Sequence, residues 1–133
     1  MSAYSINAST GILSALTPDS GTSSGPCSIL VGAGGNFVYV ANNYSGKVAV
    51  YSLNQGSGVL SQISNSTPIG TTPEYIALDP SGNFGYALND NGSTNPGMVS
   101  IYAINKGTGV WQATGSSAAC GKSPRWIATT YLP

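Results

Sequence analysis

Two residues of opposite charge follow prolines at equivalent places of a repeating pattern, and they are of the types that hydrolytic chemistry needs. Glu74 comes directly after Pro73, and Arg125 comes directly after Pro124. A carboxylate can act as a general base, and a guanidinium can stabilise an oxyanion that develops during a reaction. The two residues therefore predict either a reactive pair or a structural ion pair, because charges beside a partly buried surface usually neutralise one another.

An aromatic residue follows each member of this pair. Tyr75 comes after Glu74, and Trp126 comes after Arg125. The two rings can form a ledge for a flat ligand such as a sugar, or they can pack between neighbouring repeats. The candidate binding residues are therefore Glu74, Tyr75, Arg125 and Trp126.

The two cysteines offer a third kind of chemistry. Cys27 occupies the place of Glu74 in an earlier repeat, and Cys120 lies far from it in the sequence. Without a Cys-x-x-Cys spacing, neither a zinc ribbon nor a thioredoxin-type redox pair is available. Free thiols are the simpler interpretation, and a disulfide, including one between chains, is the alternative.

The composition excludes several classes of function. The chain has 133 residues and weighs 13.4 kDa, and its four basic and four acidic side chains give no net charge. We therefore expect one domain, with neither nucleic acid nor a membrane surface as a partner. Histidine is absent, which removes the usual general base and the commonest zinc ligand. No cofactor and no metal site are expected.

The sequence also bears on cellular location. It contains no apolar run long enough to cross a membrane, and its first residues lack the basic and apolar regions of a signal peptide. We therefore expect a soluble chain. Its low charge and its many Ser, Thr, Asn and Gly residues are typical of bacterial extracytoplasmic proteins, but the compartment stays open.

Internal repeats organise the chain. Three copies of the pattern Tyr-x-x-Asn-x-x-x-Gly recur at offsets of 47 and 51 residues. The copies begin at Tyr4, Tyr51 and Tyr102. A second block begins at Pro26, recurs at Pro73 and starts again at Pro124. Periods of this length are the signature of a repeat architecture.

Each period contains the pattern of four short strands. The expected strands are 28–31, 37–42, 48–53 and 59–63 in one period, and 75–78, 84–88, 98–104 and 110–114 in the next. The first strand of each set is a compact apolar run and is expected to lie innermost. Four antiparallel strands per repeat predict an all-β fold of β-propeller blades. A β-sandwich is the alternative, but it does not require the same residues to return at a fixed offset.

Two consecutive motifs carry a resemblance to a known family. They are Pro-Glu-Tyr-Ile-Ala-Leu-Asp-Pro-Ser-Gly-Asn-Phe-Gly-Tyr at 73–86 and Val-Ser-Ile-Tyr-Ala-Ile-Asn-Lys-Gly-Thr-Gly at 99–109. Together they resemble the repeat of the lactonase-type propellers. That group includes a class of 6-phosphogluconolactonases and the surface-layer proteins with Tyr-Val-Thr-Asn repeats, to which Tyr-Val-Ala-Asn at 39–42 is similar. The resemblance extends over nearly the whole chain, and its motifs are more specific for the blade than for an activity.

The resemblance implies a ring of seven blades, whereas this chain holds fewer than three periods. We expect a partial blade at 3–16, complete blades at 27–65 and 74–114, and the first strand of a further blade at 125–131, which makes eleven strands. The exposed inner strands and open sheet edges must be covered. Either the chain is part of a longer propeller, or it assembles as a homo-oligomer, for which a six-bladed dimer is favoured.

The resemblance also implies a lactone hydrolase in which histidine, arginine and acidic residues converge on the central channel. This chain has no histidine, so Glu74 and Arg125 alone would act as base and oxyanion stabiliser. The leading prediction is therefore a non-enzymatic scaffold or binding module. The alternative is a lactonase-type hydrolase acting on a sugar lactone, and a third possibility is a sugar-binding module that uses Tyr75 and Trp126.

Overall fold

The computed structural model describes residues 2–16, 21 and 24–130. These residues form ten β-strands and no helix, which confirms the predicted all-β class. The strands are β1 (Ala3–Ile6), β2 (Leu13–Leu16), β3 (Pro26–Val31), β4 (Phe37–Asn42), β5 (Lys47–Leu53), β6 (Leu60–Pro68), β7 (Pro73–Leu78), β8 (Phe84–Asn89), β9 (Pro96–Ile104) and β10 (Trp111–Lys122). In this part of the chain, nothing has the form of an apolar membrane-crossing helix.

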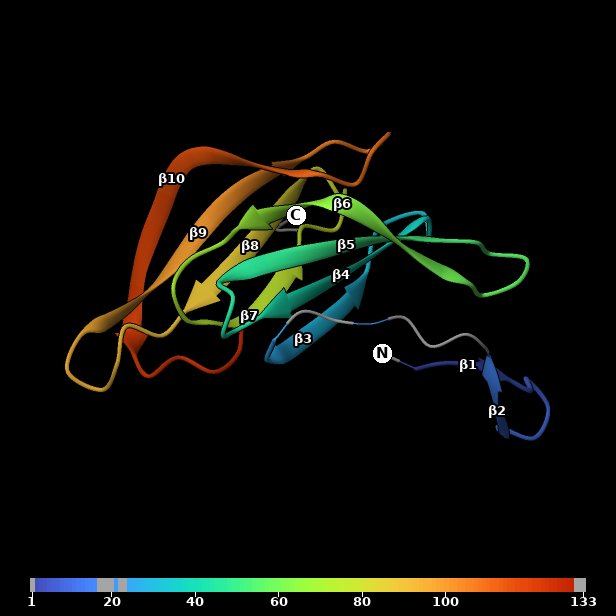
Figure 1. The fold of residues 1–133 in the computed structure, drawn as a ribbon. Helices are drawn as coiled ribbons and strands as arrows, with labels where there is room; N and C mark the ends of the chain where they lie inside the picture. Colours follow the sequence, from blue (N-terminus) through green and yellow to red (C-terminus); the bar gives the residue numbers. More distant parts are fainter. Residues whose placement is uncertain (1, 17–20, 22–23, 131–133) are drawn as a thin grey trace.

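Two four-stranded antiparallel sheets make up most of the molecule (Figure 1). One has the strand order β3-β4-β5-β6 and the other has the order β7-β8-β9-β10, so every strand pairs with its neighbours in sequence. The strands β1 and β2 form a separate hairpin, which Figure 1 shows to one side of the two sheets. A four-stranded meander repeated along the chain is the architecture of propeller blades, as predicted.

The recurring asparagine and glycine close the turn between the third and fourth strands. The Asn54 side-chain oxygen accepts hydrogen bonds from two backbone amides within the turn, each at 3.0 Å. Gly58 completes the turn with a φ of 70°, a conformation that glycine adopts without steric cost. Asn7 and Asn105 make the same bonds in their own repeats. The motif therefore determines where each outer hairpin reverses.

The main core lies between the two four-stranded sheets. Its buried residues are Tyr39, Ala41, Val48, Val50, Ile69, Ile76, Ala87, Tyr102 and Trp111. The Trp111 ring is 5.5 Å from the Tyr39 ring and 5.6 Å from the Tyr102 ring, measured between centroids. Gly85 lies directly against the indole of Trp111. A Cβ at this position would be only 2.5 Å from the indole ring. Burial of these side chains holds one sheet against the next.

The outer strands are longer than the sequence pattern predicts. β6 extends to Pro68 and β10 to Lys122, beyond the expected ends at 63 and 114. The pairing of β6 with its neighbour contains one register shift, and that of β10 contains two, between Ala113 and Ser117 and between Ala119 and Lys122. A bulge inserts residues that break the two-residue alternation of side chains. The alternation pattern therefore predicts that the strand ends where the bulge begins.

The segment 124–130 also differs from the prediction, which gave an inner strand over 125–131. Residues 124–130 contain no strand, and residue 131 lies outside the described residues. A first strand needs a second strand to complete its hydrogen bonds, and none of the described strands pairs with this segment. The described chain therefore has ten strands where eleven were expected.

Candidate functional site

Equivalent positions of successive repeats contact one another along β3, β7 and the segment 124–130. Cys27 Sγ lies 3.1 Å from the carbonyl oxygen of Pro73, which connects the starts of β3 and β7. The Thr129 hydroxyl donates a hydrogen bond to the Leu78 carbonyl, which connects the far end of β7 to the C-terminal segment. The three segments thus run side by side, and their first residues meet at one edge of the molecule.

Arg125 is held between two carboxylates at this edge. Its Nη1 lies 3.1 Å from Glu74 Oε2, and its Nη2 lies 3.8 Å from Asp90 Oδ2. The Arg125 side chain is 58% exposed, whereas those of Glu74 and Asp90 are 26% and 13% exposed. The guanidinium is therefore the most accessible group of this cluster, and the two carboxylates lie largely beneath the surface.

Two residues that the sequence analysis missed complete the cluster. Asn43 Nδ2 donates to the Pro73 carbonyl at 2.9 Å and approaches Glu74 Oε1 at 3.4 Å. The Asp90 amide donates to the Thr72 carbonyl at 3.1 Å, and the Thr72 hydroxyl donates to the Asp90 carbonyl. Asn43 and Asp90 each follow the asparagine that ends a second strand, one repeat apart. Their shared position in the repeat was the signal that could have identified them.

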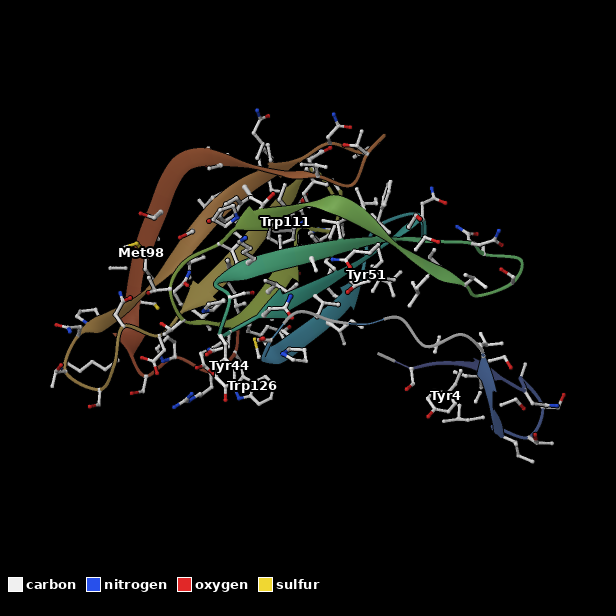
Figure 2. All side chains as sticks on the ribbon, in the orientation of Figure 1. Tyr4, Tyr44, Tyr51, Met98, Trp111 and Trp126 are labelled. Atoms are coloured by element: carbon white, nitrogen blue, oxygen red, sulfur yellow. The ribbon has the colours of Figure 1, made fainter. Side chains whose placement is uncertain are left out.

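Three aromatic residues border the charged cluster. The Tyr75 and Trp126 rings meet edge to face, with centroids 5.4 Å apart and planes at 62°. Tyr44 follows Asn43, and its ring covers Gly25 so closely that a Cβ there would be 2.8 Å away. Trp126 is 79% exposed and Tyr44 is 84% exposed, and Figure 2 shows both at the same edge of the molecule. Large apolar surfaces left in water in this way are typical of binding sites.

Cys27 stands at the same edge, where its thiol also approaches the Ala41 carbonyl at 3.4 Å. Burial and the negative charge of Glu74 raise the pKa of the Cys27 thiol above its ordinary value. The thiol is therefore protonated at neutral pH and a poor nucleophile. Within the single chain, Cys27 and Cys120 are both free, and a disulfide between chains stays the open alternative.

The structure brings all four sequence-predicted site residues to one edge. Glu74 contacts Arg125, and Tyr75 contacts Trp126, while their roles in binding or catalysis stay predictions. Chemically, the edge offers two carboxylates that can accept protons, a guanidinium that can polarise a carbonyl, and exposed rings. Over the residues that the structure describes, no three His, Cys, Asp or Glu side chains gather in a way that could hold a metal ion.

Comparison with known proteins identifies the family of the chain. The sequence profile of the family described as "Lactonase, 7-bladed beta-propeller" matches residues 1–71 and 53–131. A protein of Bacteroides uniformis described as a candidate 6-phosphogluconolactonase has 25% sequence identity and a TM-score of 0.79 over 96% of this chain. No curated protein sequence matches the chain.

Two further solved structures share the fold. The periplasmic gluconolactonase of Pseudomonas aeruginosa has 21% identity and a TM-score of 0.71 over 91% of this chain. A protein of unknown function from Desulfotomaculum acetoxidans has 22% identity and a TM-score of 0.72 over 89%. This chain covers 37%, 34% and 34% of the Bacteroides, Pseudomonas and Desulfotomaculum proteins, respectively, so it spans about a third of their length. With its family match over nearly the whole sequence and its two blade-like sheets, the chain belongs to the lactonase family of seven-bladed β-propellers.

Proposed function

We propose that this chain forms part of a propeller that hydrolyses a sugar lactone, with the cluster of Glu74, Asp90 and Arg125 at the reacting centre. The observation that carries the proposal is the 3.1 Å contact between a carboxylate and a half-exposed guanidinium. The two groups come from adjacent inner segments and are open to a ligand. Family membership and the likeness to a candidate 6-phosphogluconolactonase support this reading.

Hydrolysis would use the two charged groups in turn. Arg125 carries five N–H donors, so contacts with Glu74 and Asp90 leave donors for the lactone carbonyl oxygen. Glu74 Oε1 has one long contact, with Asn43 at 3.4 Å, and can accept a proton from an attacking water molecule. Oxygen from this water bonds to the carbonyl carbon, and negative charge on the carbonyl oxygen is stabilised by Arg125. The ring C–O bond then breaks, the ring oxygen takes the proton from Glu74, and a hydroxy acid is released.

The alternative of a purely structural scaffold, which the sequence analysis favoured, has less support. It rested on the missing histidine, but a carboxylate and a guanidinium can supply a base and an oxyanion stabiliser without one. We also propose that copies of this chain or further blades close the ring around the site, and that the protein is extracytoplasmic. The low charge of the chain and its likeness to the periplasmic Pseudomonas protein support this location.

The test is the hydrolysis of D-gluconolactone, followed by acid release at constant pH with spontaneous hydrolysis subtracted. We expect Glu74→Gln to lower kcat by about 100-fold or more, the range lost with a general base. Asp79→Asn is the matched control: it removes the same charge at the other end of β7, roughly 17 Å away at about 3.3 Å per residue, and should keep the parent rate. Equal turnover by Glu74→Gln and the parent, or no acceleration by the assembled parent propeller, would overturn the proposal.

A further inference from the structure

Asn91 and Gly92 form the only Asn-Gly pair of the sequence, and they lie in the connection between β8 and β9. Each of the other asparagines precedes a residue that carries a side chain. An asparagine followed by glycine can lose ammonia, because the backbone nitrogen of the glycine reaches the side-chain carbonyl carbon without hindrance from a Cβ. The pair is therefore a candidate site of covalent modification, which the proposed hydrolysis does not use.

The reaction is a deamidation in which every bond is accounted for. The Gly92 nitrogen attacks Cγ of Asn91, the new C–N bond closes a succinimide ring, and the bond from Cγ to Nδ2 breaks. Ammonia leaves with the proton that the Gly92 amide gives up. Water then opens the ring at either carbonyl, which produces aspartate or isoaspartate. The net change replaces a neutral amide with a carboxylate.

The surroundings of the pair leave room for this reaction. Asn91 and Gly92 are both exposed. Gly92 has a φ of 84°, and a Cβ built there would meet no atom within 4 Å. Exposed loops open locally at a small cost in free energy. Water and the conformations that cyclisation needs are therefore both accessible.

Two hydrogen bonds hold the reacting groups in other contacts. The Gly92 amide donates to Asp90 Oδ1 at 2.9 Å, and Asn91 Nδ2 donates to the Pro96 carbonyl at 3.0 Å. The Gly92 nitrogen must leave the Asp90 carboxylate before it can attack. The negative charge of this carboxylate also disfavours loss of the amide proton, because the resulting anion would be repelled. Asp90 therefore opposes the reaction in two ways.

Asp90 also connects the pair to the charged cluster. Its second carboxylate oxygen, Oδ2, lies 3.8 Å from Arg125 Nη2, so one carboxylate contacts both the guanidinium and the amide that it restrains. Deamidation would remove the donor that Asn91 offers to the Pro96 carbonyl, because an ionised carboxylate only accepts hydrogen bonds. It would also add a negative charge in the residue next to Asp90.

We propose that Asn91 is the site of spontaneous deamidation in this chain and that the Asp90 carboxylate slows the reaction through its hydrogen bond with the Gly92 amide. The inference is independent of the proposed lactone hydrolysis. It is carried by the exposed Asn-Gly pair and by the 2.9 Å contact between Asp90 Oδ1 and the Gly92 nitrogen.

The first experiment identifies the modified residue. The 133-residue chain is incubated at mildly alkaline pH, and peptide mapping by mass spectrometry locates aspartate and isoaspartate formed from asparagine. We expect conversion first at Asn91. Asn91→Gln should remove this first conversion, because glutamine would have to close a larger ring. Earlier conversion of another asparagine, or no conversion at Asn91 while the unfolded chain is fully converted there, would overturn the assignment.

The second experiment tests the restraint by Asp90. We expect Asp90→Ala to deamidate at Asn91 about three- to tenfold faster than the parent, because the hydrogen bond that holds the Gly92 amide is lost. Asp79→Ala is the matched control: it removes an equal charge from the connection between β7 and β8 and should keep the parent rate. Equal rates in Asp90→Ala and the parent, or an equal acceleration by Asp79→Ala, would refute the restraint.

Urea separates the folded contact from the effect of the neighbouring residue along the chain. In urea the hydrogen bond between Asp90 and Gly92 is absent, so the parent and Asp90→Ala should deamidate at the same rate. If the variant keeps its full acceleration in urea, the restraint does not come from the folded loop and the proposal fails.

Discussion

At the residue scale, the site arises where equivalent positions of the repeat carry different side chains. The place after the first-strand proline holds Cys27, then Glu74, then Arg125. The place after the second-strand asparagine holds Asn43 and then Asp90. Because the repeats are adjacent, these differences between equivalent side chains bring unlike charges together. Chemistry here depends on the departures from the repeat, while the fold depends on the repeat itself.

The lowered pKa of a single residue, Asp79, makes the stability of the protein depend on pH. Partial burial opposes ionisation of Asp79, but hydrogen bonds from the Ser81 hydroxyl and from the amides of Phe84, Ser81 and Asn83 outweigh it and hold its pKa below the ordinary value of 3.8. A lowered pKa in the folded state stabilises the protein above pH 3.8, and this contribution is lost as the pH falls through the folded-state pKa.

The prediction is that the parent loses its stability advantage over Asp79→Asn as the pH is lowered below about 4. Urea unfolding of both proteins at several pH values between 7 and 3 measures the difference. The comparison with the variant removes the effect of other carboxylates that titrate in the same range. An advantage that is constant over this range, or that grows on acidification, would contradict the assignment.

At the element scale, the contact between sheets depends on a glycine under an indole. Trp111 begins β10 and reaches across its own sheet to Gly85 on β8, and the centroid of its ring lies 5.5 Å from that of Tyr39 in the other sheet. The strands themselves could be predicted, because alternation and turn residues are local. The extra length of β6 and β10 could not, since a bulge depends on the partner strand rather than on the sequence of one strand.

Gly85→Ala tests this packing. A Cβ at position 85 would lie 2.5 Å from the Trp111 ring, so the indole must shift within a filled core. Overpacking of this kind costs about 1–3 kcal/mol, which we expect as a lower free energy of unfolding in urea. Gly121→Ala, in a place where a Cβ meets no atom within 4 Å, is the matched control and should change stability little. Equal stabilities of the two variants would refute the role given to Gly85.

At the scale of the whole molecule, the described chain leaves apolar surface uncovered. Ile6 and Leu13 of the hairpin and Ile29 and Val31 of β3 are each more than half exposed. Strands β1 and β10 also have open edges, which readily pair with other chains. Blades of a propeller bury such faces against their neighbours. We therefore expect further blades or further copies to lie beside the residues described here.

We expect the 133-residue chain in isolation to associate rather than to remain monomeric. Light scattering behind a sizing column, at several concentrations and with and without reductant, gives the mass. A compact species of about twice 13.4 kDa that resists dilution would support closure by a second copy, whereas a heterogeneous distribution would favour completion by further blades. A monomer that persists at all concentrations would contradict the expectation that these faces need a partner.

The sequence alone was enough to predict the all-β class and the blade repeat, and it singled out Glu74, Tyr75, Arg125 and Trp126 as candidate binding residues, a role that stays a prediction. These follow from local patterns, since side-chain alternation, turn residues and repeat offsets are properties of the chain order. The folded structure was needed to show that Asp90 lies beside Arg125, that Asn43 approaches Glu74, and that Tyr44 lies at the same edge. Those contacts depend on how one sheet lies against the next, which is set by the packing of the buried core and not by the spacing of residues along the chain.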